Sequence, residues 1–313
     1  MPEIDLKNKI YVKADKKVAW EDIPKGIETI GSYAFANTLV GKVFVPSSLK
    51  KVAKSAFENC PDLYQCDLPI GIEIIEDDAF NGCKSLEIID CVSGSGYEQN
   101  FLSDIKSVGR NAFTNCKKFT TVDYGVSDSI VPWGCFLGCT NLTEVNISSP
   151  TVEYINSNAF YDCKKLKTVK LPAVLKTISV NAFYNCCKLD HIDLPKTVTI
   201  LYPGAFMNCT SLKYFNIDDI DNASLRLIGA NTFSNCTQLK TFVVPENVQV
   251  IGEGAFNGCS NLEQVIFKSD MQLALLENAD KIFTNCLKLT RLEFPSCILV
   301  KDGLLKKWRK ADN

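Results

Sequence analysis

Residues 163–183, CKKLKTVKLPAVLKTISVNAF, decide the fold, because their pattern recurs from one end of the 313-residue chain to the other. A cysteine is followed by a leucine three residues later, by apolar residues at six and eight, and finally by an Ala-Phe pair. Self-similarity at a fixed period is the sequence signature of repeat proteins. The number and spacing of the copies are therefore the main evidence for the fold.

Aligned on the phenylalanine, the chain contains eleven copies, separated by 22 to 33 residues with 23 as the commonest spacing. A cysteine follows the phenylalanine by three residues in ten copies, and Thr38 takes its place in the first. We expect both columns to face the core. The phenylalanines are Phe35, Phe57, Phe80, Phe113, Phe136, Phe160, Phe183, Phe206, Phe233, Phe256 and Phe283, and the cysteines are Cys60, Cys83, Cys116, Cys139, Cys163, Cys186, Cys209, Cys236, Cys259 and Cys286.

The spacing within one copy predicts its local structure. Alternating apolar residues at positions six and eight after the cysteine indicate a short strand with one buried face. A phenylalanine and a cysteine three residues apart fit one helical turn, α or 3₁₀, on the same inward side. Such a unit cannot bury its apolar face alone, so neighbouring units must stack and pair their strands in parallel. The sequence therefore predicts an α/β solenoid of about eleven repeats of about 23 residues.

The pattern IG..AF..C..L..V.LP..V..I resembles the BspA-like (Treponema pallidum type) leucine-rich repeats, which occur on bacterial surfaces, and the resemblance covers residues 23–295. It implies a right-handed horseshoe with a parallel, concave β-sheet. It also implies adhesion or another protein-binding role, as in a surface antigen, and it supplies no catalytic residues. We expect a single domain, with residues 1–22 as the N-terminal cap and residues 296–313 as the C-terminal cap.

Charge and hydropathy exclude several classes of partner. The chain has 34 basic and 36 acidic residues, so its net charge of −2 provides no global field for nucleic acid. The N-terminus is charged, and no run of 18 apolar residues occurs, so we expect neither a signal peptide nor a membrane span. We expect a cytoplasmic monomer, with a cell-surface or secreted location still open through non-classical export or removal of a signal.

The fifteen cysteines do not indicate a disulfide framework. Stacked equivalents in a parallel ladder lie about 5 Å apart. Parallel side chains at that distance nevertheless have the wrong torsion for a disulfide bond. We therefore predict buried free thiols. Cys66, Cys91 and Cys135 also fall on core positions, whereas Cys187 and Cys297 are expected to be more exposed.

Residues that could carry chemistry are scarce. His191 is the only histidine, it lies on the exposed side of a strand beside Asp193, and we interpret the two as a solvated pair. With no CxxC pair and a single histidine, the usual Cys/His zinc clusters are excluded. No phosphate-binding glycine loop precedes a helix. We therefore expect no catalytic residues, no metal and no cofactor.

The outward positions of the strands provide the candidate binding face. Aspartates dominate its first third, and it turns apolar around Tyr214 in the last third. We expect this face and the inserted loops to bind a protein partner, which would be basic or host-derived. Simple solubility explains the aspartates equally well, and an enzyme or a calcium-binding protein that uses them remains as the alternative function. The candidate residues are Asp67, Asp90, Asp123, Glu144, Asp193 and Tyr214.

Three copies carry insertions, which repeat proteins place in loops, often on the binding face. They lie within residues 92–105, after Ile217, and around residues 270–280, where LALLENA favours extra helix. Tolerated surface loops are an equally good interpretation for each.

The two ends must cover the open edges of the stack. Residues 9–20 are expected to supply a capping strand, with Trp20 covering the first core layer. At the other end we expect Ile298 and Val300 in a last strand, followed by a short helix capped by Asp302, with Leu304, Leu305 and Trp308 on one side and a solvated basic face.

Overall fold

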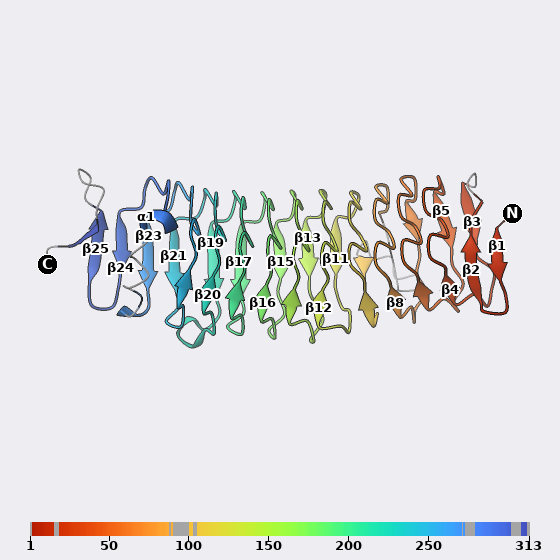
Figure 1. Cartoon of the computed structure of the whole chain (residues 1–313), viewed down its shortest axis with the longest axis horizontal. Helices are drawn as coiled ribbons and strands as arrows, with labels where there is room; N and C mark the ends of the chain where they lie inside the picture. The colour runs from red at the N-terminus through yellow and green to blue at the C-terminus, as the bar shows by residue number, and fades with distance from the viewer. Residues whose placement is uncertain are drawn as a thin grey trace. The chain divides into compact units, whose positions relative to one another are not determined.

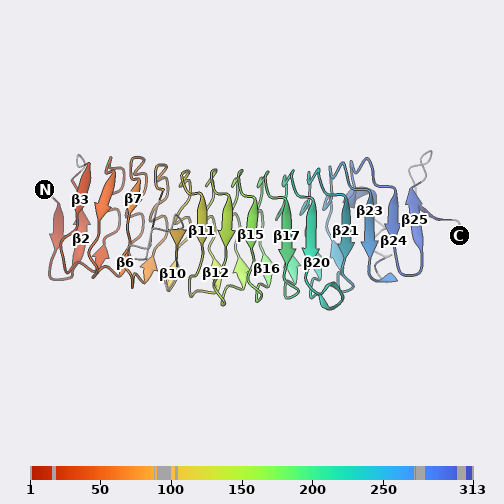
Figure 2. The ribbon, with the colours of Figure 1, turned by 180° about the vertical axis from the view of Figure 1, so that it is seen from behind.

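The computed structural model of the chain describes residues 2–15, 19–87, 89, 100–102, 105–270, 272, 279–301 and 308–311. They divide into two compact units, unit 1 at Met1–Pro172 and unit 2 at Ala173–Asn313. Each unit is a parallel-strand β-solenoid whose strands form two rows, and most coils contribute one strand to each row (Figures 1 and 2). The predicted leucine-rich repeat solenoid is thereby confirmed.

The two rows differ in their place within the repeat. In sequence, the strands of the long-strand row come after the column cysteines. The strands of the short-strand row come before the column phenylalanines. In unit 1 the long-strand row is β3 (Trp20–Asp22), β5 (Lys42–Phe44), β7 (Gln65–Cys66), β9 (Asn100–Phe101), β11 (Thr121–Asp123), β13 (Glu144–Asn146) and β15 (Thr168–Lys170). Its short-strand row is β2 (Ile10–Lys13), β4 (Thr29–Ile30), β6 (Lys51–Val52), β8 (Ile74–Ile75), β10 (Ser107–Val108), β12 (Ile130–Val131) and β14 (Tyr154–Ile155).

Unit 2 repeats this arrangement. Its long-strand row is β17 (His191–Leu194), β19 (Tyr214–Ile217), β21 (Thr241–Val244), β23 (Gln264–Phe267) and β24 (Arg291–Glu293). Its short-strand row is β16 (Thr177–Ile178), β18 (Ile200–Leu201), β20 (Leu227–Ile228) and β22 (Val250–Ile251). The described helices of the chain are short, namely the 3₁₀ helix η1 (Ile220–Asn222) and α1 (Ala279–Ile282). No described helix has the length and apolar character needed to cross a membrane.

The phenylalanine column forms the centre of each unit. All eleven side chains are at most 4% exposed. Within unit 1, neighbouring rings from Phe35 to Phe160 stack with centroids 4.8–5.7 Å apart. In unit 2, Phe206 stacks between Phe183 and Phe233 at 5.3 and 5.7 Å. Offset stacking at these distances stabilises aromatic pairs beyond the burial of their area.

The cysteine column has a specific hydrogen-bonding role. Nine of the ten column thiols donate to the backbone carbonyl oxygen of the phenylalanine in the preceding coil, as Cys83 does to Phe57 at 3.0 Å and Cys209 does to Phe183 at 3.2 Å. Nine such bonds measure 2.9–3.4 Å. None of the fourteen cysteines in the described ranges is in a disulfide; Cys91 lies outside them.

We expect a thiol reagent to modify Cys187 and Cys297 in the folded protein and to spare the column cysteines. Those two are half-buried, whereas the column thiols are buried, and burial raises the pKa of Cys139 to about 12. The thiolate is the reactive form, so burial protects the column by limiting access and, at Cys139, also by disfavouring ionisation. Mass mapping after iodoacetamide treatment, with and without denaturant, checks this expectation. Labelling of several column cysteines in the folded protein would contradict the packing described here.

Around ten of the eleven phenylalanines the chain forms a pair of turns rather than the helical turn that the spacing suggested, whereas Phe283 directly follows α1. The cysteine N–H does donate to the phenylalanine carbonyl, for example Cys163 to Phe160 at 3.2 Å, as in a 3₁₀ turn. However, residues two before and two after the phenylalanine have φ near +60°, for example Asn181 and Asn185 around Phe183. A helix cannot continue through this left-handed region, which favours Asn, Asp and Gly.

These left-handed positions also pack on one another between coils. Where asparagine follows asparagine, the amides bond, as Asn235 Nδ2 does to Asn208 Oδ1 at 2.9 Å. Where glycine follows asparagine, the asparagine Oδ1 occupies the space of a Cβ, as Asn115 does beneath Gly138. The recurrence of Asn, Asp and Gly at these two positions was readable in the sequence and indicates the turns.

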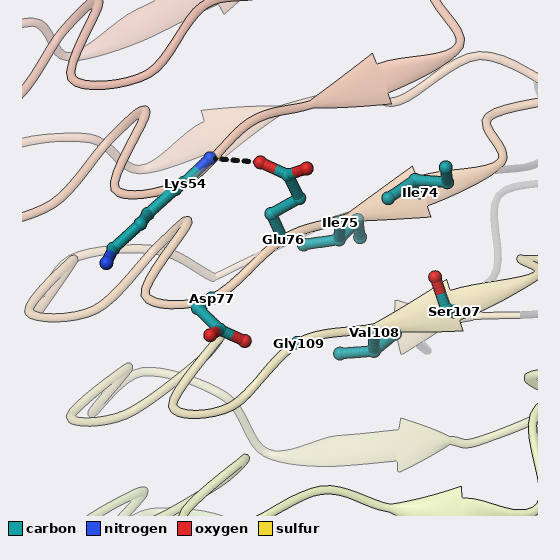
Figure 3. A pocket seen from close by; sticks show the side chains of 8 residues that line it. All are labelled: Lys54, Ile74, Ile75, Glu76, Asp77, Ser107, Val108 and Gly109. Atoms are coloured by element: carbon teal, nitrogen blue, oxygen red, sulfur yellow. Dashed lines mark hydrogen bonds between the residues drawn. The ribbon is translucent and has the colours of Figure 1, made fainter.

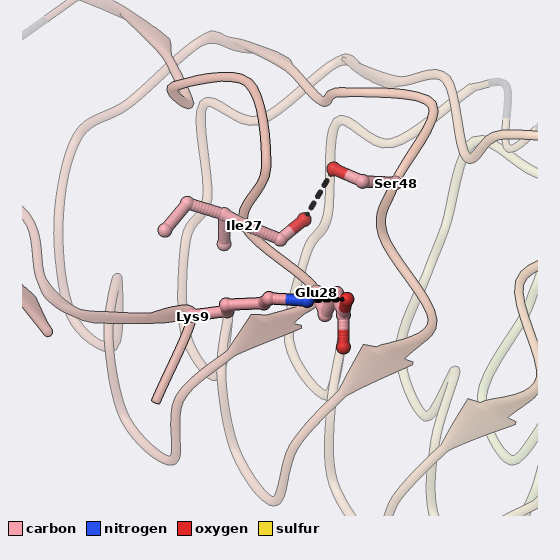
Figure 4. A network of polar contacts seen from close by, with 4 residues as sticks. All are labelled: Lys9, Ile27, Glu28 and Ser48. Carbon is pink, nitrogen blue, oxygen red and sulfur yellow. Dashed lines mark hydrogen bonds and ion pairs between the residues drawn. The ribbon is translucent and has the colours of Figure 1, made fainter. Parts of the chain in front are cut away.

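Opposite charges alternate along one column of the short-strand row in unit 1. Lys9, Glu28, Lys50, Glu73 and Lys106 succeed one another, and each backbone N–H donates to the preceding residue's carbonyl. Lys9 pairs with Glu28 (Figure 4), and Lys106 Nζ lies 2.8 Å from Glu73 Oε2. The bond from Lys106 lowers the pKa of the Glu73 carboxyl. Opposite charges on adjacent strands favour this register, whereas like charges would oppose it.

The N-terminal cap closes the short-strand row. β1 (Glu3–Asp5) pairs antiparallel with β2, which lies in the predicted capping stretch. Tyr11 of β2, and not Trp20, covers the first core layer, because its buried ring stacks on Phe35 at 5.1 Å while Trp20 is 65% exposed. Tyr11 is in register with Ile30 of β4 and not with Phe35, so the repeat spacing does not mark it as the capping ring.

The C-terminal cap closes the long-strand row, and it differs from the prediction. β25 (Ile298–Lys301) pairs antiparallel with β24, and β26 (Trp308–Lys310) pairs antiparallel with β25. Trp308 therefore lies in a strand and not on a helix, and Lys301 Nζ lies 5.7 Å from its ring centroid. The free edge of β24 explains the difference, because it offers hydrogen bonds that an isolated short helix would not satisfy. Leu304 and Leu305 lie outside the described residues.

Candidate functional site

The outer side of the long-strand row, called the long-strand face below, is the surface that the sequence marked for binding. Alternation along each strand sets its composition, because residues one apart point to opposite sides of a sheet. In β13, Val145 is buried between Glu144, which is exposed, and Asn146, which is half-buried. Each coil thus presents two or three outward side chains, fixed by a buried neighbour.

In unit 1 the predicted acidic residues are arranged differently from a continuous stripe. Asp67 is exposed and accepts a hydrogen bond from Gln65 Nε2 at 2.7 Å. Asp90 lies outside the described residues. The residues in register with Asp123 are Phe101 of β9 and Asn146 of β13. The strand paired with β11 on this side therefore comes from the insertion at residues 92–105, where a loop was expected.

The carboxylate of Asp123 is already engaged. Asn146 Nδ2 donates to it at 3.0 Å, and Ser148 Oγ also donates to it. Calcium requires six to eight oxygen ligands. No group of three or more His, Cys, Asp or Glu side chains suited to a metal ion occurs in the described part of the chain. Asp123 therefore serves as a hydrogen-bond acceptor that links β11 to β13.

In unit 2 the same kind of bridge recurs, since Asn216 Nδ2 donates to Asp193 Oδ1 at 2.9 Å. Tyr214 is in register with His191 and is 64% exposed. His191 Nδ1 lies 2.6 Å from Asp190 Oδ1, so its acidic neighbour is Asp190 and not Asp193. This pair is exposed at the surface, without a nucleophile hydrogen-bonded to the imidazole among the described residues.

The second insertion is tied to neighbouring coils. Lys196 Nζ lies 2.8 Å from Asp219 Oδ2, and Lys268 Nζ lies 3.2 Å from Asp221 Oδ1. The hydrogen bond between Lys196 and Asp219 lowers the pKa of the Asp219 carboxyl and raises the pKa of the Lys196 ammonium. The third insertion is anchored by Gln272, whose buried amide donates to the Pro245 carbonyl at 2.6 Å. The stretch LALLENA, where extra helix was expected, lies outside the described residues except for Ala279, at which α1 begins.

Two hollows lie among the described residues of unit 1. One of about 460 Å³ lies between β8 and β10, with Glu76 and Asp77 on its rim (Figure 3). Glu76 accepts from the Lys54 backbone N–H at 2.8 Å, and Asp77 accepts from that of Arg110 at 2.7 Å. Another, of about 550 Å³, has Trp133 at its edge. The carboxylates in the first hollow therefore bind backbone amides that hold one coil against the next.

One surface feature escaped the sequence analysis. Trp20, Phe44 and Tyr64 lie on three successive coils of unit 1 and are 65%, 45% and 49% exposed. They form what we call the aromatic patch, at the N-terminal end of the long-strand face. Exposed aromatic residues are enriched at protein interfaces. The strand alternation that marks Lys42 and Phe44 as outward would have located it.

Comparison with known proteins finds a family of repeats and several solved structures of leucine-rich repeat proteins. The family described as BspA type leucine rich repeat region matches in six copies, over residues 9–101, 93–213, 129–242 and 226–302. A leucine-rich repeat protein of Eubacterium ventriosum is 28% identical, with a TM-score of 0.47 over 64% of this chain and 46% of that one. The Treponema pallidum leucine-rich repeat protein is 23% identical, with a TM-score of 0.41 over 61% of this chain and 77% of that one.

The pneumococcal vaccine antigen PcpA is 18% identical, with a TM-score of 0.45 over 91% of this chain and 82% of that one. The chain thus spans about half the length of the Eubacterium ventriosum protein. No curated protein matches the chain. The similarity to these solved structures concerns the fold.

Proposed function

The chain belongs to the BspA type leucine-rich repeat family, and from this premise we propose that it is a non-enzymatic module that binds a protein partner through its long-strand face. Proteins of this repeat architecture generally mediate protein–protein interaction or adhesion. The inserted segment at β9 contributes to the same row as β11 and β13, so it belongs to the proposed surface.

One observation carries the proposal. In each unit, the described part of the long-strand face offers many outward side chains held by buried neighbours, and these do not converge on one point. In β13 and β19, for example, Glu144 and Tyr214 are exposed. An enzyme requires a nucleophile, base or metal gathered around one reacting atom. A protein interface instead requires roughly 800 Å² per partner, spread over about 20–30 residues. The extended face suits the second requirement.

The test compares two faces with matched changes of charge. Thr168→Arg with Tyr214→Arg adds two positive charges to the long-strand face. Ser129→Arg with Gln249→Arg adds two to exposed positions on the short-strand side. Partners are first captured from the source cells by crosslinking and identified by mass spectrometry, and a purified partner is then titrated against each variant.

We expect the long-strand pair to weaken binding at least tenfold, because an unpaired charge buried in an interface is costly. The short-strand pair should leave the affinity within about twofold. Equal losses from both pairs, or a loss confined to the short-strand pair, would refute the proposed surface. Circular dichroism of both variants establishes that they fold.

A further inference from the structure

The aromatic patch has a defined geometry in unit 1. Trp20 of β3 is in register with Lys42 of β5, and Lys42 is in register with Gln65 of β7. Asp22 is in register with Phe44. Adjacent strands lie about 4.8 Å apart, so these side chains share a surface of roughly 10 Å by 7 Å. The patch is a small platform on three neighbouring strands.

Small residues leave room for the third ring of the platform. Tyr64 donates its backbone N–H to Gly41, and Gly41 donates its own to Ala19. A Cβ placed on Gly41 would lie 3.3 Å from Tyr64 Cε1, so the tyrosine ring leans back over the glycine. The ring therefore lies over Gly41, in the direction of the preceding coil.

Carboxylates border the rings, and a cation is already bound to one of them. Lys42 Nζ lies 4.7 Å from the ring centroid of Phe44, a cation–π distance. Asp22 and Asp67 are both exposed, and they lie on the two sides of Phe44, on the preceding and the following coil. Within the described residues neither aspartate is in an ion pair. The platform thus combines exposed aromatic rings with two aspartates outside any ion pair, against the single positive charge of Lys42.

We propose that the aromatic patch binds an extended, arginine-containing segment of the protein partner. This inference rests on the proposed function and names the partner chemistry at one end of the long-strand face. A guanidinium stacks on an aromatic face while it donates two parallel hydrogen bonds to a carboxylate. Trp20 and Asp22 are two residues apart on one strand, roughly 6.6 Å, and so provide both partners for one arginine side chain.

The charges favour arginine over two other ligands. A lysine ammonium would pair with Asp22 or Asp67 but lacks the planar group that stacks on Trp20. A neutral carbohydrate would use the rings and leave both carboxylates without an opposite charge. Arginine satisfies the rings and the carboxylates together.

The test uses a fluorescein-labelled peptide of alternating arginine and glycine, with lysine and citrulline counterparts, titrated against the full chain by fluorescence anisotropy. Citrulline keeps the shape of the arginine side chain and removes its charge. Trp20→Ala, Tyr64→Ala and Asp22→Asn are the patch variants. Trp133→Ala is the matched control, because Trp133 is also an exposed tryptophan of unit 1, at 41%.

We expect the arginine peptide to bind at least tenfold more tightly than the citrulline peptide and more tightly than the lysine peptide. Each aromatic variant should weaken it two- to fivefold, as for an exposed cation–π contact. Asp22→Asn should weaken it and reduce the salt dependence, and Trp133→Ala should change nothing. Equal binding of the arginine and citrulline peptides, or indifference to Trp20→Ala, would overturn the proposal.

Two further outcomes separate this inference from the function it rests on. Binding of a neutral oligosaccharide that is lost in Trp20→Ala would overturn the arginine assignment in favour of carbohydrate. A partner whose affinity responds to Thr168→Arg with Tyr214→Arg but not to Trp20→Ala would refute the patch and leave the long-strand face standing. A partner indifferent to both sets would refute the proposed function itself.

Discussion

Phe206→Ala is expected to lower the free energy of unfolding by about 3–5 kcal/mol, as is usual for deleting a buried aromatic side chain. The Phe206 ring is fully buried between Phe183 and Phe233, and Phe215 meets it edge-on with centroids 5.4 Å apart. Deletion leaves a cavity between coils whose backbones are fixed by hydrogen bonds, for example from Phe206 N to Thr232 O at 2.9 Å. The site therefore has little room to collapse.

Urea unfolding followed by circular dichroism measures this loss, with Tyr214→Ala as the control. Tyr214 is 64% exposed in the same unit, so its removal should change stability by less than about 0.5 kcal/mol. Phe183→Ala should behave like Phe206→Ala, because it occupies the same column. A loss below 1 kcal/mol for either phenylalanine would show that the column does not carry the core.

Gly109→Ala is expected to cost about 1–3 kcal/mol, the usual range for overpacking a tight contact. A Cβ at Gly109 would lie within 3.0 Å of Asp77 N and Glu76 C, which are backbone atoms of the preceding coil. The backbone there is held by hydrogen bonds, including one from Gly109 N to Ile75 O at 2.7 Å. A flexible side chain could rotate away, whereas this backbone cannot move without losing those bonds.

Gly31→Ala is the matched control, because Gly31 occupies the same position, four residues before its phenylalanine, in an earlier coil. The nearest atom to its added Cβ would be Tyr11 O at 3.0 Å, a milder contact. We expect Gly31→Ala to lower the melting temperature less than Gly109→Ala does. If the two variants have the same melting temperature, the close approach of the backbone at Gly109 does not determine the stability of the fold.

The parts of the structure predictable from sequence are those set by burial. A phenylalanine, a cysteine and alternating strand residues recur because each coil must fill the same space, so a single repeat such as residues 163–183 carries the information. The helical turn was inferred from Phe160 and Cys163 alone, and the left-handed residues Asn158 and Asp162 around them specify turns instead.

The caps and the insertion were harder to predict, because their structure depends on what they pair with. Trp308 lies in a strand because β26 pairs with the free backbone groups along the edge of β25. No local sequence pattern indicates that edge. β9 pairs with β11 although it lies within an insertion, so counting from Cys83 did not reveal the neighbour of Asp123. The aromatic patch went unnoticed because Trp20 was assigned to the core layer that Tyr11 occupies.

The antiparallel caps have a consequence for how this protein can vary in length. In a parallel stack, each coil presents a strand edge on which the next coil can pair in the same register. β1 runs opposite to β2, and at the other end the antiparallel hairpin of β25 and β26 takes the place of a coil, so another molecule's coil would not meet a regular coil edge at either capped row. At the remaining N-terminal edge, Glu21 of β3 stands in register with Val43 and, one coil further, Cys66, and places a carboxylate where growth would require an apolar residue. Growth therefore terminates at both capped rows, while whole coils can be gained or lost between the caps without altering either end.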